Sequence, residues 1–380
     1  MFYYLCGKII WIIYFGKMKI LYIVSWKIPF EENNLKNIVN TQFGYYTLKS
    51  KDVDITWFTH NRKSFLYILC KWLKIPQINP IFSQLSVVGK SKQYDVIYVG
   101  FDMHLLPLAV CKLLGLIKTP IFVLSHFSYS TKYTTSRWKK VYKNFERRLV
   151  YKAFDKITFA CDTLLRLAKE DFSVPERHLN VADWGANLKF YDKGIFNAPP
   201  SNQYFVAAGG MNRDYATLIE AFRKYPNANL RVYAKYRDYT NGKELPENVY
   251  FGNLFAGRSF SDAYKALREE YYNAIAVLLP IDYINDVPNG ATVLVEALAM
   301  GKPIVITEAD TNYIDVEKEG CGLTVKRHDV DGWVEAIRFL KENPIKAKEM
   351  GEKAYLLAKT KYNDELFADN ILMQMKMMFK

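Results

Sequence analysis

The stretch PNGATVLVEALAMGKPIVIT, from Pro288 to Thr307, combines a glycine-bearing loop, a helix-length apolar segment and a short apolar strand. Gly290 and Ala291 keep the entrance to the helix small, and Thr292 is a candidate N-cap. Gly301 is the kind of residue that ends a helix, so the strand PIVIT follows at once. A loop, a helix and a strand in this order form the repeating unit of a parallel sheet covered by helices.

The same alternation of short apolar strands and helix-period segments runs along the whole chain. A first series of strand-like segments covers residues 19–25, 54–59, 95–100, 120–126 and 156–161. A second series covers residues 204–210, 230–235, 248–253, 275–280 and 303–307. Short apolar strands interleaved with helices predict parallel sheets that are buried on both faces. Two series predict an α/β protein made of two doubly wound, Rossmann-like domains that face each other across a cleft.

The domain boundary is expected where two consecutive prolines interrupt this pattern, within residues 195–203. We therefore place an N-terminal domain at 18–195 and a C-terminal domain at 203–363. The Met-rich segment 364–380 is predicted to be an amphipathic helix that packs back on the first domain.

The first seventeen residues are apolar and aromatic, but a glycine and a lysine interrupt them. They are too short to span a bilayer, which needs roughly 20 apolar residues, and they lack a small-residue cleavage site. Two interpretations stay open. The segment 1–17 is either a short membrane-associating extension, or it precedes a translation start at Met18. The abrupt start of strand patterning at Met18 favours the second.

Charge and cysteine usage narrow the class of protein further. Residues 1–190 hold 28 Lys and Arg against 13 Asp and Glu, a balance of +15, whereas residues 191–380 hold 24 against 26, a balance of −2. A basic first half suggests a polyanionic partner, such as anionic lipid, nucleic acid or an acidic substrate. The five cysteines have no metal or disulfide spacing, which fits a reducing compartment. They are Cys6, Cys70, Cys111, Cys161 and Cys321.

The segment AAGGMNRDYATLIEAF places Gly209, Gly210 and Arg213 between a strand and a helix that is expected to begin near Tyr215. Glycines allow close backbone approach, the helix start is expected to offer free N–H groups, and Arg213 adds a cation with several donors. This combination suits a diphosphate, although a tight turn with a surface arginine has the same pattern. The chain has neither G-x-G-x-x-G nor a P-loop motif, which disfavours dinucleotide oxidoreductases and P-loop NTPases.

Glu296 is the single carboxylate in the apolar segment from Pro288 to Thr307. Near the helix start it could face the cleft and accept hydrogen bonds from ribose or sugar hydroxyls. It could equally be an acid that the helix dipole favours near the N-terminus. The spacing alone does not decide between the two.

Together these segments resemble the GT-B glycosyltransferases, in particular the retaining family 4 and its relatives. NGATVLVEALAMGKPIVIT is similar to the family's donor-site segment, GGMNRDYATLIEAF to its diphosphate-gripping segment, and VADWGANLKFYDK (residues 181–193) to its stretch leaving the N-terminal domain. PIFVLSHFS resembles the strand whose closing histidine reaches the transferred sugar. The resemblance implies that Glu296 binds the donor ribose, that Arg213 and the Gly210 amides bind the diphosphate, and that His126 is catalytic. The implied donor site comprises Gly209, Gly210, Arg213, Lys235, Asn289, Gly290, Ala291, Thr292 and Glu296.

The sequence also departs from this family pattern. The family shows two glutamates spaced E-x7-E, but Pro288 stands eight residues before Glu296, with Asp286 and Asn289 beside it. The family's first donor-site arginine has no counterpart, and Arg213 stands in the place of its lysine. Lys235 is the candidate for the second cation. His126 has a structural alternative as well, because a histidine that follows an apolar strand is often only a packing residue, and His104 is the second candidate.

A leaving diphosphate can be stabilised by helix starts and Arg213 without a metal ion. We therefore expect no metal and no cofactor besides the nucleotide-sugar co-substrate. The two D-x-D segments, at 52–54 and 329–331, precede a strand and a helix and are interpreted as turn and cap acids. Retention of configuration is a further expectation from the family.

Basic and aromatic residues are interleaved in two segments of the first half, 131–154 and 61–75. This composition suits binding to an anionic membrane surface, although a solvated helix face or a nucleic-acid surface has a similar composition. We expect a cytoplasmic glycosyltransferase on the inner face of the membrane, which transfers sugar to a glycan or lipid-linked acceptor in cell-surface polysaccharide synthesis. A sugar-nucleotide epimerase or hydrolase of the same fold is one alternative. A non-enzymatic nucleic-acid-binding module is the other, but it gives no purpose to the loops of Arg213 and Glu296, so no nucleic-acid partner is expected.

Overall fold

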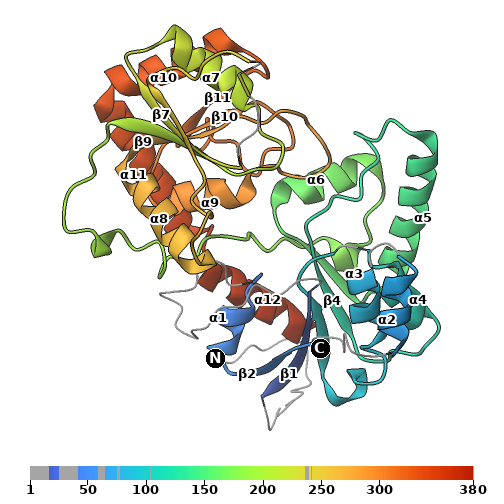
Figure 1. Ribbon diagram of the computed structural model, residues 1–380. Helices are drawn as coiled ribbons and strands as arrows, with labels where there is room; N and C mark the ends of the chain where they lie inside the picture. Colours follow the sequence, from blue (N-terminus) through green and yellow to red (C-terminus); the bar gives the residue numbers. More distant parts are fainter. Residues whose placement is uncertain are drawn as a thin grey trace.

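The computed structural model describes residues 17–24, 42–58, 65–74, 78–102, 104–235, 239–240 and 242–379. Its chain forms two lobes, each built around a parallel sheet with helices on both faces (Figure 1). Residues 1–16 lie outside the described part, so the expectations for the first seventeen residues stay predictions. The first strand does begin at Met18.

The sheet of the first lobe has five strands among the described residues, in the order β2-β1-β3-β4-β5. All of its strand pairs are parallel. The strands are β1 (Met18–Ile23), β2 (Val53–Trp57), β3 (Val96–Val99), β4 (Ile121–Ser125) and β5 (Lys156–Phe159). The helices of this lobe are α1 (Tyr45–Lys49), α2 (Phe65–Trp72), α3 (Ile78–Leu85), α4 (Leu106–Leu113), α5 (Arg137–Ala153) and α6 (Asp162–Asp171).

The sheet of the second lobe has six parallel strands within the described ranges, in the order β11-β10-β9-β6-β7-β8. The strands are β6 (Tyr204–Ala208), β7 (Asn229–Tyr233), β8 (Val249–Gly252), β9 (Ala274–Leu279), β10 (Ile304–Thr307) and β11 (Gly322–Val325). The helices that follow the first lobe along the chain are α7 (Tyr215–Lys224), α8 (Phe260–Asn273), α9 (Ala291–Ala299), α10 (Val330–Glu342), α11 (Pro344–Thr360) and α12 (Asp364–Met377).

The central strands explain why the sequence folds this way. Every residue of β3, β4, β6 and β10 is buried, because helices cover both faces of each sheet. The ten strands expected from the sequence are all present, and the prediction of an α/β protein with two Rossmann-like sheets is confirmed. Strand β11 was not expected from the sequence, because its four residues begin with a glycine and are only partly buried, which leaves a weak strand signal.

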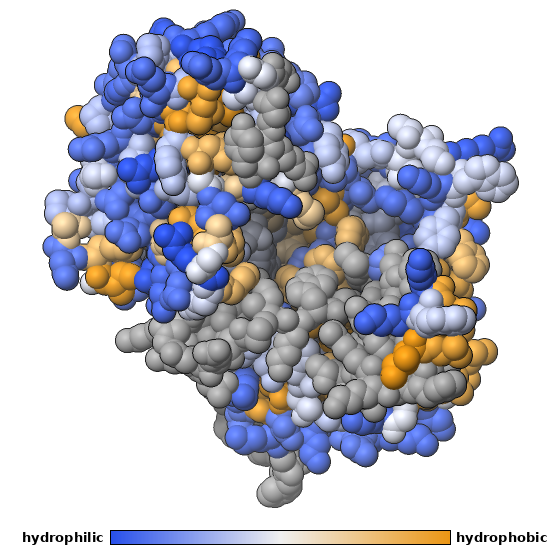
Figure 2. All heavy atoms as spheres, viewed as in Figure 1, coloured by the Kyte–Doolittle hydropathy of each residue, from blue (hydrophilic) through white to orange (hydrophobic). Residues whose placement is uncertain are grey.

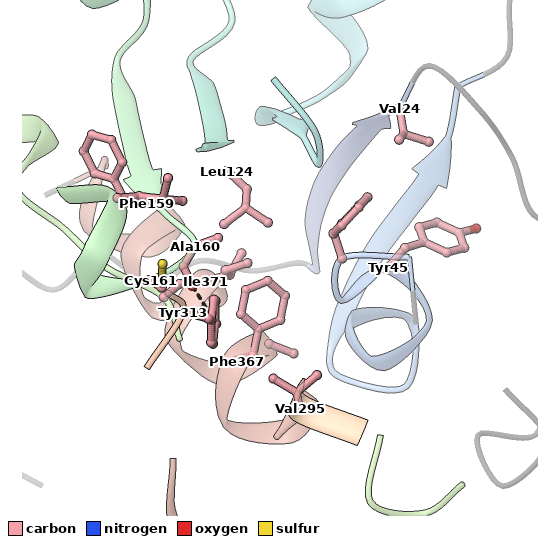
Figure 3. Close-up of a cluster of buried hydrophobic side chains, with 14 of the residues drawn as sticks. Val24, Tyr45, Leu124, Phe159, Ala160, Cys161, Val295, Tyr313, Phe367 and Ile371 are labelled. Atoms are coloured by element: carbon pink, nitrogen blue, oxygen red, sulfur yellow. Dashed lines mark hydrogen bonds between the residues drawn. The ribbon is translucent and has the colours of Figure 1, made fainter. Parts of the chain in front are cut away.

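The C-terminal helix α12 returns to the first lobe and lies beside α1 (Figure 1). Figure 3 shows Phe367 and Ile371 of α12 between Leu124 of β4 and Val295 of α9. All four belong to one buried cluster that runs through both lobes. Polar contacts reinforce this packing: the Gln374 side chain accepts a hydrogen bond from the hydroxyl of Thr158 at 2.5 Å. The helix therefore joins the first sheet to the helix that carries Glu296.

Candidate active site

Three loops at the carboxyl ends of strands approach each other between the two lobes. They are residues 209–214 after β6, 280–290 after β9, and 126–133 after β4. The surface is hollowed between the lobes (Figure 2). In open α/β sheets, ligands bind beyond the carboxyl ends of the strands, so these loops form the candidate site.

Arg213 is the central residue that the second lobe contributes to the candidate site. Its guanidinium lies against two glycines of different loops: a Cβ placed on either Gly209 or Gly290 would stand 3.2 Å from Nη2 of Arg213. Both glycines have positive φ, +105° and +80°, which other residues rarely adopt. Nη1 donates to the carbonyl of Met211 at 2.9 Å, while Nε is buried with no hydrogen-bond partner in the described part of the chain. The two predicted glycine loops therefore meet on one cation.

The loops after β6 and β9 are also tied by hydrogen bonds. The Asn212 side chain donates to the carbonyl of Tyr283 at 2.7 Å and accepts from the Tyr283 N–H at 2.8 Å. Asn289 donates to the Asn285 side chain at 2.8 Å, which braces the loop from within. Asn289 is thus committed to loop structure, and Gly290 and Ala291 follow it directly at the start of α9.

Helix α9 has the open N-terminus of this region. Its N-cap is Gly290, and no side chain caps its first turn. The prediction that Thr292 is the N-cap is wrong: Thr292 lies one residue inside the helix and its side chain is exposed, because the positive φ of Gly290 already turns the chain. Free N–H groups and the helix dipole make the start of α9 a favourable place for an anion.

Helix α7 starts differently from the expectation of free N–H groups. It begins at Tyr215 as predicted, but the Asp214 carboxylate accepts a hydrogen bond from the Thr217 N–H at 3.0 Å. The other oxygen of Asp214 is 2.7 Å from Nδ1 of His328. A carboxylate therefore already occupies the start of α7, while Gly210 before it has open space around the position of a Cβ.

Glu296 is inside the protein instead of on the surface of the hollow. It is 4% exposed, and its Oε2 accepts a hydrogen bond from the hydroxyl of Tyr271 in α8 at 3.2 Å. Burial raises the pKa of Glu296 to about 7, and hydrogen bonding to tyrosines opposes the shift. The expectation of a carboxylate that looks out of the helix start is therefore not what the fold provides, because the side chain points to α8.

Lys235 is exposed just beyond β7. Among the described residues, no hydrogen bond or ion pair joins it to Arg213 or to either glycine loop. Its candidacy as the second donor-site cation therefore stays a prediction.

His126 follows β4 directly, on the edge of the first sheet that faces the second lobe. Its ring stacks on Phe101 with centroids 4.6 Å apart and also contacts Phe43. Nε2 lies 3.2 Å from the carbonyl of Gly100, and since a carbonyl only accepts, Nε2 carries the proton. Burial lowers the pKa of His126 to about 4, so the imidazole is neutral at physiological pH.

Asp102, in the loop after β3, is a buried neighbour of His126 that was not predicted from the sequence. Its carboxylate accepts from the His126 backbone N–H at 2.8 Å and from the hydroxyl of Ser125. Burial raises its pKa to about 6, although these hydrogen bonds favour the charged form. Its position three residues after the buried strand β3 was the available signal. Asp102 holds the backbone that carries His126.

The two lobes are connected across the hollow by ion pairs and hydrogen bonds. Lys143 of α5 lies 2.5 Å from the carboxylate of Asp286, and Ser128 donates to the carbonyl of Asp286 at 3.3 Å. Further along, Lys132 pairs with Asp310 at 2.7 Å. The loop after β9 therefore touches both the loop after β4 and the basic helix α5.

Comparisons with known proteins agree with this geometry. Residues 197–357 match the family described as "Glycosyl transferases group 1". A search of curated proteins found no significant match. A glycosyltransferase from Rickettsia africae has the same fold with 16% identity and a TM-score of 0.64, over 96% of this chain and 100% of its own.

Two further solved structures share the fold. HepE from Anabaena, in complex with UDP and glucose, is 15% identical with a TM-score of 0.65, over 95% of this chain and 100% of its own. A UDP-N-acetylglucosamine 2-epimerase is 11% identical with a TM-score of 0.56, over 96% of this chain and 98% of its own. At such identities the likeness shows the fold alone.

The fold and its facing loops define a protein of the GT-B class. Within that class, residues 197–357 match the family of group 1 glycosyltransferases. The resemblance stated from the sequence is thereby confirmed, and these findings support an enzyme of the transferase type.

Proposed function

We propose that this protein transfers a sugar from a nucleoside-diphosphate sugar to a glycan or lipid-linked acceptor at the inner face of a membrane, in cell-surface polysaccharide synthesis. The observation that carries the proposal is the position of Arg213. A partly buried guanidinium stands between two positive-φ glycines, beside the uncapped start of α9. An oxyanion is the natural ligand of such an arrangement.

The proposed chemistry follows from charge. When the bond between the anomeric carbon and the diphosphate oxygen breaks, the diphosphate takes the electron pair and its negative charge grows. Arg213 and the N–H groups of α9 are fixed before the reaction, so they stabilise this charge without reorganising. We therefore propose that the reaction needs no metal ion.

The first lobe supplies a neutral imidazole, that of His126, to the opposite side of the site. With Nε2 protonated toward Gly100, the Nδ1 atom of His126 is left as a hydrogen-bond acceptor. A neutral acceptor of this kind suits a hydroxyl group of the transferred sugar. Retention of configuration remains part of the proposal through the family resemblance alone.

The membrane part of the proposal rests on helix α5. Four large side chains on one face of this helix are exposed, at the spacing i, i+3, i+4, i+7 that places residues on one helix face. They are Trp138, Val141, Tyr142 and Phe145, and Trp138 is 83% exposed. Exposed basic residues lie along the same helix: Arg137, Lys139, Lys140, Arg148 and Lys152. An apolar ridge flanked by cations matches the surface of an anionic membrane.

Helix α4 extends this surface. Val110 and Leu113 are exposed on it, and Leu114 and Leu116 are exposed just beyond its end. Hydrophobic spheres gather on this lobe in Figure 2. No helix of the described residues is long and apolar enough to cross a bilayer.

The test begins with the purified full chain and a panel of UDP-, GDP- and dTDP-sugars. We expect one donor class to raise the melting temperature, and Arg213→Ala to abolish that rise while Arg223→Ala, at the far end of α7, preserves it. With that donor and glycan or lipid-linked acceptors, transfer should continue in excess chelator. Loss of activity that only a divalent ion restores would contradict metal independence.

An epimerase or hydrolase is the second candidate, because an epimerase shares this fold over 96% of the chain. Incubation with the nucleotide sugar alone separates the candidates. The transferase proposal expects the donor to persist until acceptor is added. An epimeric or free sugar formed without acceptor supports the second candidate instead.

A further inference from the structure

A second cavity lies at the opposite end of the second sheet, away from the candidate active site. Its volume is about 860 Å3. Residues at or just before the amino ends of β6, β7, β9 and β10 line it, together with α11 and the segment that leads out of the first lobe. A volume in the range of ligand pockets, roughly 300–1,000 Å3, is far more than a single small ion needs.

The lining is strongly basic. Four lysines and one carboxylate line this cavity: Lys193, Lys302, Lys341, Lys348 and Glu352. Four positive charges against one negative leave a formal balance of +3. Among these five residues, Lys348 and Glu352 form an ion pair, and it is long, with 3.9 Å between Nζ and Oε1. A concave surface with this charge attracts anions.

Lys302 is the most unusual of these lysines because it is only 7% exposed. Its Nζ donates to the carbonyl of Ala274 at 2.8 Å and to the side chain of Asn202 at 3.2 Å, both neutral acceptors. An ammonium has three N–H donors, so one remains after these two bonds. A buried cation normally has an anionic partner, and among the described residues Lys302 has none within ion-pair distance.

The positions of the other groups are fixed by a close helix contact. A Cβ on Gly351 of α11 would stand 2.4 Å from the carbonyl of Gly301, so only glycine allows this approach. The approach places the face of α11 that carries Lys348 and Tyr355 over the end of α9. Nζ of Lys193 lies 3.8 Å from the centroid of the Tyr355 ring. The packing of the helices therefore fixes the backbone that carries these lysines.

The start of α11 adds a further positive contribution. This 17-residue helix begins at Pro344, and the side chain of its N-cap residue, Asn343, makes no capping bond with the first turn. Pro344 and Ala347 line the cavity. The positive end of the helix dipole and the lysines therefore act on the same space.

The electrostatic state of the lysines favours binding of an anion. Burial and, to a smaller extent, the charge of Lys193 lower the pKa of Lys302 to about 8. Burial also lowers the pKa of Lys193. An anion between these groups would reverse both effects.

We propose that this cavity binds a small organic phosphate, such as a sugar phosphate or a nucleoside monophosphate. The phosphate group lies among Lys193, Lys302 and Lys348, and the remainder of the ligand contacts the rings of Tyr272 and Tyr355. The apolar side chains of Ile275 and Met300 complete the space for that remainder. The site is separate from the donor site, since it lies at the other end of the strands.

Titration calorimetry on the full chain tests this proposal with three probes: glucose 1-phosphate, uridine monophosphate and inorganic phosphate. We expect at least one organic phosphate to bind the wild type more tightly than inorganic phosphate does. Lys193→Met with Lys348→Met should weaken that binding about tenfold or more, because charge-assisted hydrogen bonds are lost. A matched variant, Lys318→Met with Lys346→Met, removes two exposed lysines outside the cavity and should bind like the wild type.

Arg213→Ala separates this site from the donor site. It should leave the binding unchanged even if the proposed transferase function fails. If the double variant does not fold, Lys341→Met, at the exposed end of α10, provides a milder loss of charge, and it should weaken binding in the same direction.

Three results would overturn the proposal. The first is that the Lys193→Met, Lys348→Met double variant and Lys341→Met both bind the same organic phosphate as tightly as the wild type does. The second is the absence of binding by both organic probes or binding of inorganic phosphate that is equally tight. The third is binding that Arg213→Ala abolishes, which would place the ligand in the donor site.

Discussion

The carboxyl ends of the two sheets have the same architecture and opposite chemistry. In the second lobe, the fold places a guanidinium between two glycines beside an uncapped helix start. In the first lobe, it places Asp102 and His126 in a buried network where burial favours the neutral form of each: the pKa of Asp102 rises to about 6 and that of His126 falls to about 4. The comparison suggests a cationic half for the diphosphate, and for the sugar a half in which the imidazole of His126 is neutral.

The largest effect is expected when the guanidinium of the cationic half is removed. Arg213→Ala should lower kcat/KM about 10²–10³-fold, which is the usual consequence of removing one fixed donor from a developing negative charge. Steady-state kinetics with the identified donor measure it. Arg223→Ala, which removes a partly exposed arginine of α7, serves as the control. Activity within a factor of about two of wild type in Arg213→Ala would remove the arginine from the site.

The next effect concerns Glu296, which is buried on α9 against α8. Its folded pKa of about 7 is above the ordinary value of 4.5, so the stability it contributes is fully present below pH 4.5 and is lost as pH rises through 7. A shift of this size corresponds to about 3 kcal/mol. Glu296→Gln should therefore gain stability relative to wild type as pH rises from 4.5 to 8. Urea unfolding at a series of pH values measures it, and a difference that does not change with pH would contradict the buried state.

A third effect concerns membrane binding, which is expected of the basic first lobe and not of the nearly neutral second lobe. Trp138→Ser with Phe145→Ser on α5 should weaken binding to anionic vesicles about tenfold or more, because about 1.5–3 kcal/mol of apolar burial is lost for each side chain. Co-sedimentation with phosphatidylglycerol and phosphatidylcholine vesicles measures it. Ile345→Ser with Leu356→Ser removes two exposed apolar side chains of the second lobe and should have no effect. Equal binding by both double variants would contradict docking through α5.

The smallest effect is expected on the free energy of unfolding, when residues at the two helix starts of the second lobe are replaced. Thr292→Ala should change the free energy of unfolding by less than about 0.5 kcal/mol, because Thr292 is exposed and caps nothing. Asp214→Ala, which removes a real cap of α7, should cost about 1 kcal/mol or more. Thermal unfolding of both variants measures the difference. Equal losses would show that the two helix starts are not distinguished by their caps.

The sequence predicted the strands well because β-strands in covered parallel sheets are continuous apolar runs, and ten of them were located. It predicted the start of α7 at Tyr215 and the end of α9 before Gly301 for similar reasons, since local turn chemistry marks both. It failed where the outcome depends on packing. Glu296 is buried because Tyr271 of α8 covers it, and nothing within α9 itself shows that.

The periodicity of apolar residues, the positions of glycine and proline and the uneven charge were sufficient to define the fold class and the two glycine loops, because these depend on short-range sterics and on burial of strands. Only the tertiary structure decided that Gly209, Arg213 and Gly290 meet, that Asp102 supports His126, and that four lysines share one cavity. Contacts between residues far apart in the chain arise from how the helices and sheets pack, and no local pattern records that packing.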